Sequence, residues 1–166
     1  MRLFACPACG QRLHFENTTC LNCGRATGYC PDRARMAAVE PEGAAWRAVD
    51  EPDRLWRFCE NWERSACNWL LPEDEEGTLC RACRHNRLIP DLSDPANHLL
   101  WQKMEGAKRR LIYGLLRLDL PLPEPGSDHP EPLIFDFPAD TDDDAAMTGH
   151  ASGVITVALS AADDSE

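Results

Sequence analysis

Eight of the nine cysteines in this chain fall into two groups of four, and this arrangement constrains the fold more than any other feature. The first group has the spacing C-x2-C-x10-C-x2-C, in which two short turns can each present two sulfur atoms. The second has the spacing C-x7-C-x12-C-x2-C, so its first two members need a longer loop or a helical turn to meet. Four thiolates suit tetrahedral Zn²⁺, and the sequence therefore predicts two structural zinc ions. The predicted ligands are Cys6, Cys9, Cys20, Cys23 and Cys59, Cys67, Cys80, Cys83.

Two other states of these cysteines compete with zinc. Disulfide bonds need an oxidising compartment, whereas Met1 is followed almost at once by a metal-type cysteine pair and not by an apolar leader. We therefore expect a cytoplasmic protein. A tetrahedral sulfur site also accepts iron, and this alternative stays open above all at the second group. Cys30 belongs to neither group and is predicted to be a partly buried free thiol.

The net charge of -11 lies entirely in the last third of the chain. Residues 1–113 contain 16 basic and 16 acidic side chains, whereas residues 114–166 contain 1 basic and 12 acidic ones. A chain with this balance lacks the basic footprint of a protein that binds duplex DNA. No apolar run is long enough to span a membrane. Neither DNA nor a membrane is expected as a partner, and a protein partner stays open.

The sequence predicts an α+β fold in which two small β-rich modules, of zinc-ribbon or rubredoxin-like type, precede a long helix and a final strand. The expected division is a four-cysteine zinc ribbon at 1–30, a connector at 31–55, a second four-cysteine zinc module at 56–92, and a helix, an acidic segment and a strand at 93–166. The connector is expected to form loops or short strands that pack on the ribbons. Because a small metal domain cannot build a large core, aromatic residues should surround the second cysteine group. These are Trp56, Phe58, Trp62 and Trp69.

Helical periodicity is clearest over residues 93–118, where Ser93 or Asp94 can cap the helix and Pro95 suits its first turn. The expected apolar face comprises Leu99, Leu100, Met104, Ala107, Leu111, Leu115 and Leu118. The basic side chains are expected mostly on the solvated side; they are Lys103, Lys108, Arg109, Arg110 and Arg117.

β-branched residues predict a strand over 153–159, for which nothing later in the sequence supplies a partner. In the ribbon, residues 11–19 fit a hairpin with Leu13 and Phe15 on one face. The acidic run Asp140–Asp144 lacks the spacing of a calcium loop and is interpreted as a solvated loop.

The histidines of this sequence are scattered and form no His-Glu-x-x-His pattern. His85, just after Cys83, is interpreted mainly as a solvated residue, with a hydrogen bond to a metal-bound sulfur as the alternative. His150, just before the last strand, is interpreted as a turn residue. Because four protein ligands leave a zinc ion no open position, catalysis at the two predicted sites is not expected.

Several segments together resemble the bacterial zinc-binding metallopeptidase family that begins with a zinc ribbon. The resemblance covers essentially the whole chain. It is carried by residues 4–10, 15–24, 67–72, 80–84, 86–93 and 108–111, and by Thr148-Gly149-His150 ahead of Gly153-Val154-Ile155-Thr156.

The resemblance implies that the helix, acidic segment and strand at 93–166 belong to an incomplete peptidase-like domain of zincin-like fold. In that family the Gly-x-Ile-Thr strand forms one edge of the substrate cleft, and a following helix carries the catalytic His-Glu-x-x-His motif. This sequence contains no such helix motif, so no catalytic residue can be carried over. We therefore expect the N-terminal portion of a zinc-dependent metallopeptidase, cut inside its second domain and hydrolytically silent as given.

Two other roles stay open. The first is an interaction module that binds a protein or, less favoured, RNA, through Trp46, Trp62, Trp101 and a basic edge of Arg81, Arg84 and Arg87. The second is a redox or metal-storage role, for which the free Cys30 is the only special support.

Overall fold

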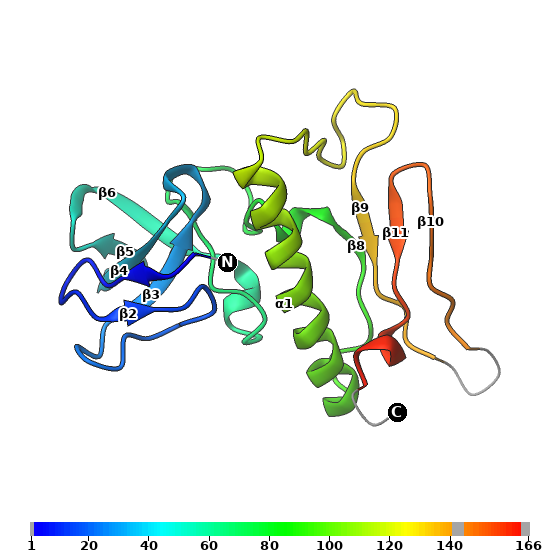
Figure 1. The fold of residues 1–166 in the computed structure, drawn as a ribbon, viewed down its shortest axis with the longest axis horizontal. Helices are drawn as coiled ribbons and strands as arrows, with labels where there is room; N and C mark the ends of the chain where they lie inside the picture. Colours follow the sequence, from blue (N-terminus) through cyan, green and yellow to red (C-terminus); the bar gives the residue numbers. More distant parts are fainter. Residues whose placement is uncertain (1, 141–144, 164–166) are drawn as a thin grey trace. The chain divides into compact units, whose positions relative to one another are not determined.

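The computed structural model describes residues 2–140 and 145–163, and the chain divides into two compact units, 1–81 and 82–166. Figure 1 traces both units along the chain, and each is described by itself. The α+β class predicted from the sequence is confirmed, because the described residues combine the helix α1 (Pro95–Arg117) with several β-sheets. No helix within the described part of the chain is long and apolar enough to cross a membrane.

The first unit contains a two-stranded and a five-stranded sheet, both antiparallel. The larger sheet has the order β3-β4-β5-β6-β7, so each strand pairs with its neighbour in sequence. Two short 3-10 helices, η1 and η2, follow β3 and β6. The bounds are β1 (Phe4–Ala5), β2 (Arg12–Leu13), β3 (Ala26–Cys30), η1 (Pro31–Arg33), β4 (Arg35–Glu42), β5 (Ala45–Ala48), β6 (Glu51–Phe58), η2 (Glu60–Trp62) and β7 (Leu70–Pro72).

Residues 31–55 do not form a separate connector. They supply β4, β5 and most of β6 to the same sheet as β3 and β7, and this sheet encloses a core made by Cys30, Ala37, Val39, Ala48, Trp56 and Leu70. The sequence conceals this arrangement because Ala37 and Ala38 give little hydrophobic signal, although both are fully buried.

Aromatic side chains join the first ribbon to the larger sheet. The ring of Tyr29 in β3 lies 5.0 Å from Phe15 and 4.9 Å from Trp69, measured between centroids. The buried Asn68 side chain donates a hydrogen bond of 2.7 Å to the Phe15 carbonyl oxygen. Leu13 and Phe15 are both buried, as the alternating pattern predicts.

The second unit places α1 beside a four-stranded sheet of order β10-β11-β9-β8 (Figure 1). The pairs β8–β9 and β9–β11 are parallel, and β10–β11 is antiparallel. The Asp94 carboxylate accepts a 2.8 Å hydrogen bond from the Ala96 N–H, which confirms the predicted cap. The other bounds are η3 (Cys83–His85), β8 (Asn86–Leu88), β9 (Ile134–Asp136), β10 (Gly149–Ala151), β11 (Val154–Thr156) and η4 (Leu159–Ala162).

The buried side of α1 differs from the predicted one. Lys108 and Arg109 are buried, whereas Leu99 and Leu111 are 58% and 45% exposed. The buried positions Trp101, Glu105, Lys108 and Ile112 recur every three or four residues, so they form one stripe. The hydrophobic pattern missed this stripe because its centre is polar.

The final strand is shorter than predicted, and its partners precede it in the sequence. Residues 154–156 form β11, which pairs with β10 and β9. His150 lies in β10 and not in the turn. The turn itself needs glycine, because Gly153 has a φ of 80° and an added Cβ would meet the Pro132 carbonyl oxygen at 2.3 Å.

Most of the predicted acidic loop lies outside the described residues. Only Asp140 of that run is described, and its carboxylate accepts a 2.7 Å hydrogen bond from the Ala146 N–H.

Candidate metal centres

The first cysteine group is assembled by two turns of the same form. In each turn the backbone N–H of a glycine donates a 2.8 Å hydrogen bond to the carbonyl oxygen of a cysteine, from Gly10 to Cys6 and from Gly24 to Cys20. These glycines have φ values of 77° and 72°, which other residues rarely adopt. The turns bring the four sulfur atoms of Cys6, Cys9, Cys20 and Cys23 within 4.8 Å of one another.

The spacing of these sulfur atoms fits a tetrahedral metal ion. Four sulfurs at about 2.3 Å from one zinc ion lie about 3.8 Å apart. The Cys6–Cys23 and Cys9–Cys20 sulfur pairs are separated by 3.8 and 3.6 Å. The donor set and the spacing therefore both suit Zn²⁺.

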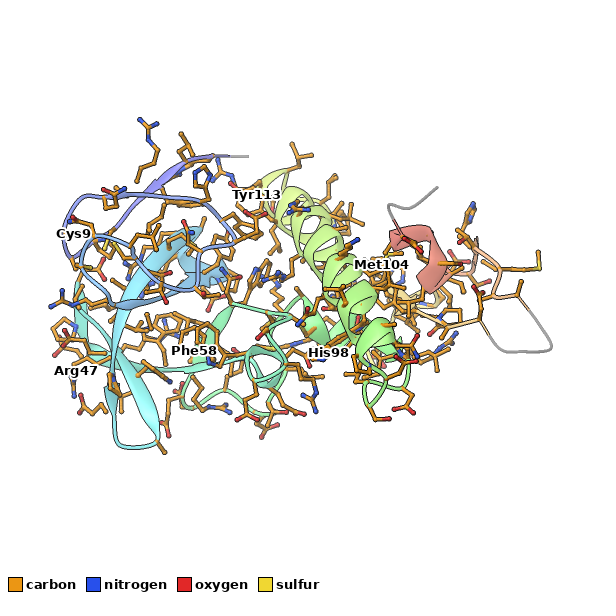
Figure 2. The ribbon with its side chains drawn as sticks, turned by 90° about the horizontal axis from the view of Figure 1, so that it is seen from below. Cys9, Arg47, Phe58, His98, Met104 and Tyr113 are labelled. Carbon is orange, nitrogen blue, oxygen red and sulfur yellow. The ribbon has the colours of Figure 1, made fainter. Side chains whose placement is uncertain are left out.

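The thiols of the first group differ in acidity. Burial raises the pKa of Cys6 to about 12, whereas a hydrogen bond from the Asn22 side chain is the main cause that lowers the pKa of Cys9 to about 6. Cys9 is exposed at the outer side of the ribbon (Figure 2). A hydrogen bond with the Arg25 backbone is the main cause that lowers the pKa of Cys23. The outer sulfurs are thus the first to become thiolates, the form that binds metal.

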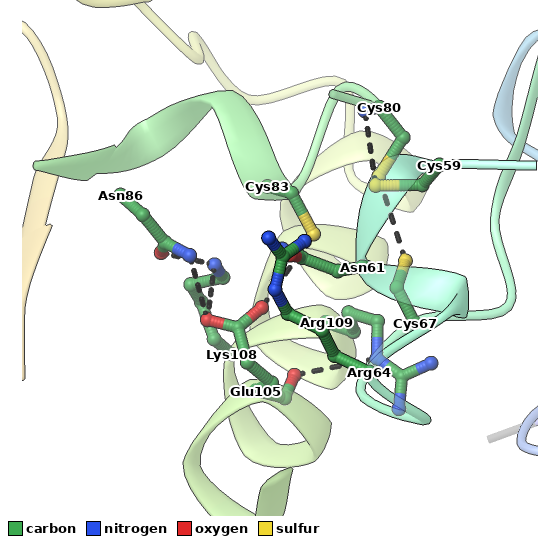
Figure 3. A network of polar contacts seen from close by, with 10 residues as sticks. All are labelled: Cys59, Asn61, Arg64, Cys67, Cys80, Cys83, Asn86, Glu105, Lys108 and Arg109. Carbon is green, nitrogen blue, oxygen red and sulfur yellow. Dashed lines mark hydrogen bonds and ion pairs between the residues drawn. The ribbon is translucent and has the colours of Figure 1, made fainter. Parts of the chain in front are cut away.

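The second cysteine group is buried throughout. The sulfur atoms of Cys59, Cys67, Cys80 and Cys83 lie within 4.8 Å of one another, and the Cys67–Cys80 pair is 3.7 Å apart. Backbone N–H groups point at two of the sulfurs. Trp69 donates to Cys67 at 3.4 Å, and Cys80 donates to Cys59, also at 3.4 Å (Figure 3). Such bonds stabilise a thiolate, so this group also fits a tetrahedral metal ion.

The long spacer between the first two members returns through a helical turn, which is one of the two routes that the spacing allows. The segment after Cys59 forms the 3-10 helix η2, in which the Trp62 N–H donates a 2.8 Å hydrogen bond to the Cys59 carbonyl oxygen. Ser65 then takes a φ of 54° and turns the chain back towards Cys67. The Glu60 carboxylate accepts hydrogen bonds from Thr78 and Arg64, and these lower its pKa.

A buried polar network adjoins the last cysteine of this group. The Sγ atom of Cys83 lies 3.5 Å from the Oε2 atom of Glu105, whose other oxygen accepts hydrogen bonds of 2.8 Å from Asn86 and Lys108 (Figure 3). Burial raises the pKa of Glu105 to about 7. Glu105 was not predicted from the sequence, because a single acid on a charged helix carries no distinct signal.

His85 is not a solvated residue. It is fully buried, its Nδ1 atom lies 2.8 Å from the Leu133 carbonyl oxygen, and burial lowers its pKa. Cys30 is a buried free thiol, as predicted, and burial raises its pKa to about 12.

Two of the three arginines of the basic edge expected after the second group form ion pairs. Arg84 pairs with Glu124, and the Arg87 Nε atom lies 3.0 Å from the Asp136 Oδ1 atom. Trp101 is fully buried, so it cannot belong to an exposed aromatic surface, whereas Trp46 and Trp62 are half-buried.

Comparisons with known proteins place both cysteine groups in one domain. Residues 3–94 match the family model of a zinc-ribbon domain, and residues 97–166 match the family described as "Putative zinc-binding metallo-peptidase". No solved structure matches the chain.

Three relatives are uncharacterized mycobacterial proteins, one from Mycobacterium bovis and two from strains of Mycobacterium tuberculosis. Each is 37% identical over 164 residues, which is 99% of this chain but 45% of the relative. The chain thus spans about half the length of the curated relatives that it matches. By its residues 3–94 the chain belongs to the zinc-ribbon family, and the residues that follow match a zinc-binding metallopeptidase family.

Proposed function

We propose that both cysteine groups hold structural Zn²⁺ and that the chain is the N-terminal, metal-stapled portion of a zinc-dependent metallopeptidase. The observation that carries the proposal is the near-tetrahedral spacing of the sulfur atoms in two separate groups. Zinc would fold the ribbons and would neutralise part of the charge of four thiolates. A reducing compartment such as the cytoplasm suits cysteines that are grouped as metal ligands and not as disulfide bonds.

We do not expect these residues alone to hydrolyse peptides. Four protein sulfurs leave a zinc ion no position for water or substrate. The sequence also lacks a His-Glu-x-x-His motif, which in a metallopeptidase supplies two ligands and the general base. The 166 residues therefore contribute structure, and any peptide cleavage belongs to a longer protein of this family.

Purified protein is expected to contain two zinc ions per chain and to cleave no peptide. The measurement combines elemental analysis with a fluorescent assay on a mixed peptide library, with added zinc throughout. Iron at the second group would appear in the elemental analysis and as visible absorbance. Cleavage that stops on chelation of zinc would contradict the proposed silence.

A groove in the first unit favours a second candidate function, binding of a protein partner. This groove has a volume of about 430 Å³ and is lined by Trp46, Phe58 and Trp62 together with Glu60 and Glu63. The Phe58 and Trp62 rings stack with centroids 4.0 Å apart. Aromatic faces beside carboxylates attract cationic side chains, so the partner would present a lysine- or arginine-rich segment. RNA is disfavoured because the net charge is -11.

A lysine-rich decapeptide should bind this groove, whereas a glutamate-rich one should not. The titration is followed by tryptophan fluorescence. Trp62→Ala is expected to weaken binding by about 1 kcal/mol, the value of an exposed cation–π contact. Leu21→Ala is the matched control, because Leu21 is 92% exposed and does not line the groove. Equal binding of both peptides, or no effect of Trp62→Ala, would exclude this candidate.

A further inference from the structure

The buried ion pair on α1 is an unusual feature of the second unit. Glu105 and Lys108 are 0% and 3% exposed, and their charged atoms are 2.8 Å apart. Removing two charges from water is expensive unless further hydrogen bonds satisfy them. Both side chains also bond to Asn86, which follows the 3-10 helix that begins at Cys83.

The ion pair also contacts a predicted metal ligand, through the second carboxylate oxygen of Glu105. Oε2 of Glu105 lies 3.5 Å from the Cys83 sulfur (Figure 3). The Lys108 ammonium group lies 5.9 Å from the ring centres of Phe135 and Phe137, so it is surrounded by apolar groups as well as by its partners. The amino group of Lys108 is therefore held one side chain, that of Glu105, away from the Cys83 sulfur.

The negative charge of the proposed metal site gives the Lys108 cation a role. Four thiolates around one Zn²⁺ leave a net charge of about -2 on the site. A carboxylate next to such a site is repelled unless a cation neutralises it, and the interior gives little screening by water. Lys108 neutralises Glu105 and so reduces the repulsion between its carboxylate and the metal-bound Cys83 sulfur. The pair then packs 3.5 Å from that sulfur and limits the directions that the Cys83 side chain can take.

We propose that Glu105 and Lys108 are positioning residues of the second metal site, holding the Cys83 sulfur towards the metal and slowing metal loss there. The inference rests on the proposed zinc occupancy of the second group. Partners that orient a metal ligand usually contribute strongly to retention, and their removal typically lowers metal affinity by about 10- to 100-fold.

The test measures metal retention at each cysteine group in the same molecule. Zinc-loaded protein is challenged with EDTA and N-ethylmaleimide, and mass spectrometry follows alkylation of each cysteine with time. Lys108→Met keeps an unbranched side chain of nearly the same size but leaves Glu105 buried without its cation. It should speed alkylation of the second group by about tenfold or more. The rate of alkylation of the first group should change by less than about twofold, since among the described residues this group shares no partner with the pair. The first group comprises Cys6, Cys9, Cys20 and Cys23.

Two further variants separate positioning from general loosening of the helix. Glu105→Gln with Lys108→Met removes both charges, keeps the shape of the Glu105 side chain and leaves an amide oxygen that can accept the Asn86 hydrogen bond. It should therefore return the rate to within about threefold of wild type. Ile112→Ala is the control, because Ile112 is buried one turn beyond Lys108 on the same helix. Ile112→Ala should leave the ratio between the alkylation rates of the two cysteine groups unchanged.

The outcomes distinguish this inference from the proposed function. If zinc does not protect the second group in the wild-type protein, the proposed zinc occupancy fails. If zinc protects it and Lys108→Met retains wild-type protection, the positioning role fails alone. The positioning role also fails if Ile112→Ala speeds alkylation of the second group as much as Lys108→Met does. It fails as well if the second group of the double variant is alkylated as fast as that of Lys108→Met.

Discussion

Replacing Cys80 by alanine is expected to release the metal of the second group and to unfold much of residues 1–81. Cys80 is fully buried, its sulfur is 3.7 Å from that of Cys67, and its N–H bonds to Cys59. Structural zinc contributes roughly 10 kcal/mol or more to the folding of small zinc domains. Whole domains are typically stable by only about 5–15 kcal/mol. The loss should therefore be visible as missing zinc in elemental analysis and as a lost unfolding transition in circular dichroism.

Cys30→Ala provides the matched control. Cys30 is as buried as Cys80 and undergoes the same change, but it lies in the core of the five-stranded sheet and outside both sulfur groups. Its loss should cost about 1–2 kcal/mol, as for a small cavity, with zinc content unchanged. Equal destabilisation by the two substitutions would mean that metal binding does not hold the fold together.

Among substitutions that add one methyl group to the first unit, Gly28→Ala is expected to lower the stability most. An added Cβ would lie 2.7 Å from Leu70 Cγ and 2.9 Å from both the Asn68 carbonyl oxygen and Phe58 Cε1. One of these neighbours is backbone, so the sheet itself must move. We expect a loss of about 3 kcal/mol or more and a fall in the melting temperature of about 10 °C or more.

Gly106→Ala tests whether the loss comes from this close packing or from alanine itself. The position lies within α1, and its nearest neighbour would be Arg109 Nη2 at 3.9 Å. Alanine should stabilise the helix there by about 0.5–1 kcal/mol. A Gly28→Ala protein with the melting temperature of the wild type would refute the close packing around β3.

Local chemistry made parts of this structure predictable from the sequence. Cysteine spacing alone indicates which sulfurs meet, because each C-x2-C turn is complete within a few residues. The cap at Asp94 is equally local, since it depends on a side chain and an N–H two residues away. The same applies to the buried alternate positions Leu13 and Phe15.

Features that depend on distant partners could not be read in this way. By sequence pattern Lys108 belongs to a solvated helix face, and only Glu105 and Asn86 beside it explain its burial. His85 is buried with its ring at hydrogen-bond distance from a carbonyl oxygen 48 residues later in the chain. Residues 31–55 form sheet strands whose small alanines carry no strong pattern, and β11 finds its partners earlier in the chain.

The two sheets differ in how far apart their strands lie along the chain, and this difference sets an order of assembly. In the sheet order β3 to β7 each strand lies beside its neighbour in sequence, and a longer-range pairing in this unit is the isolated bridge between Tyr29 and Trp69. In the second unit β8 must find β9 across the whole of α1, which entails a longer search. During synthesis the N-terminal sheet can therefore form while the ribosome is still making the rest, and the parallel strands complete the fold last.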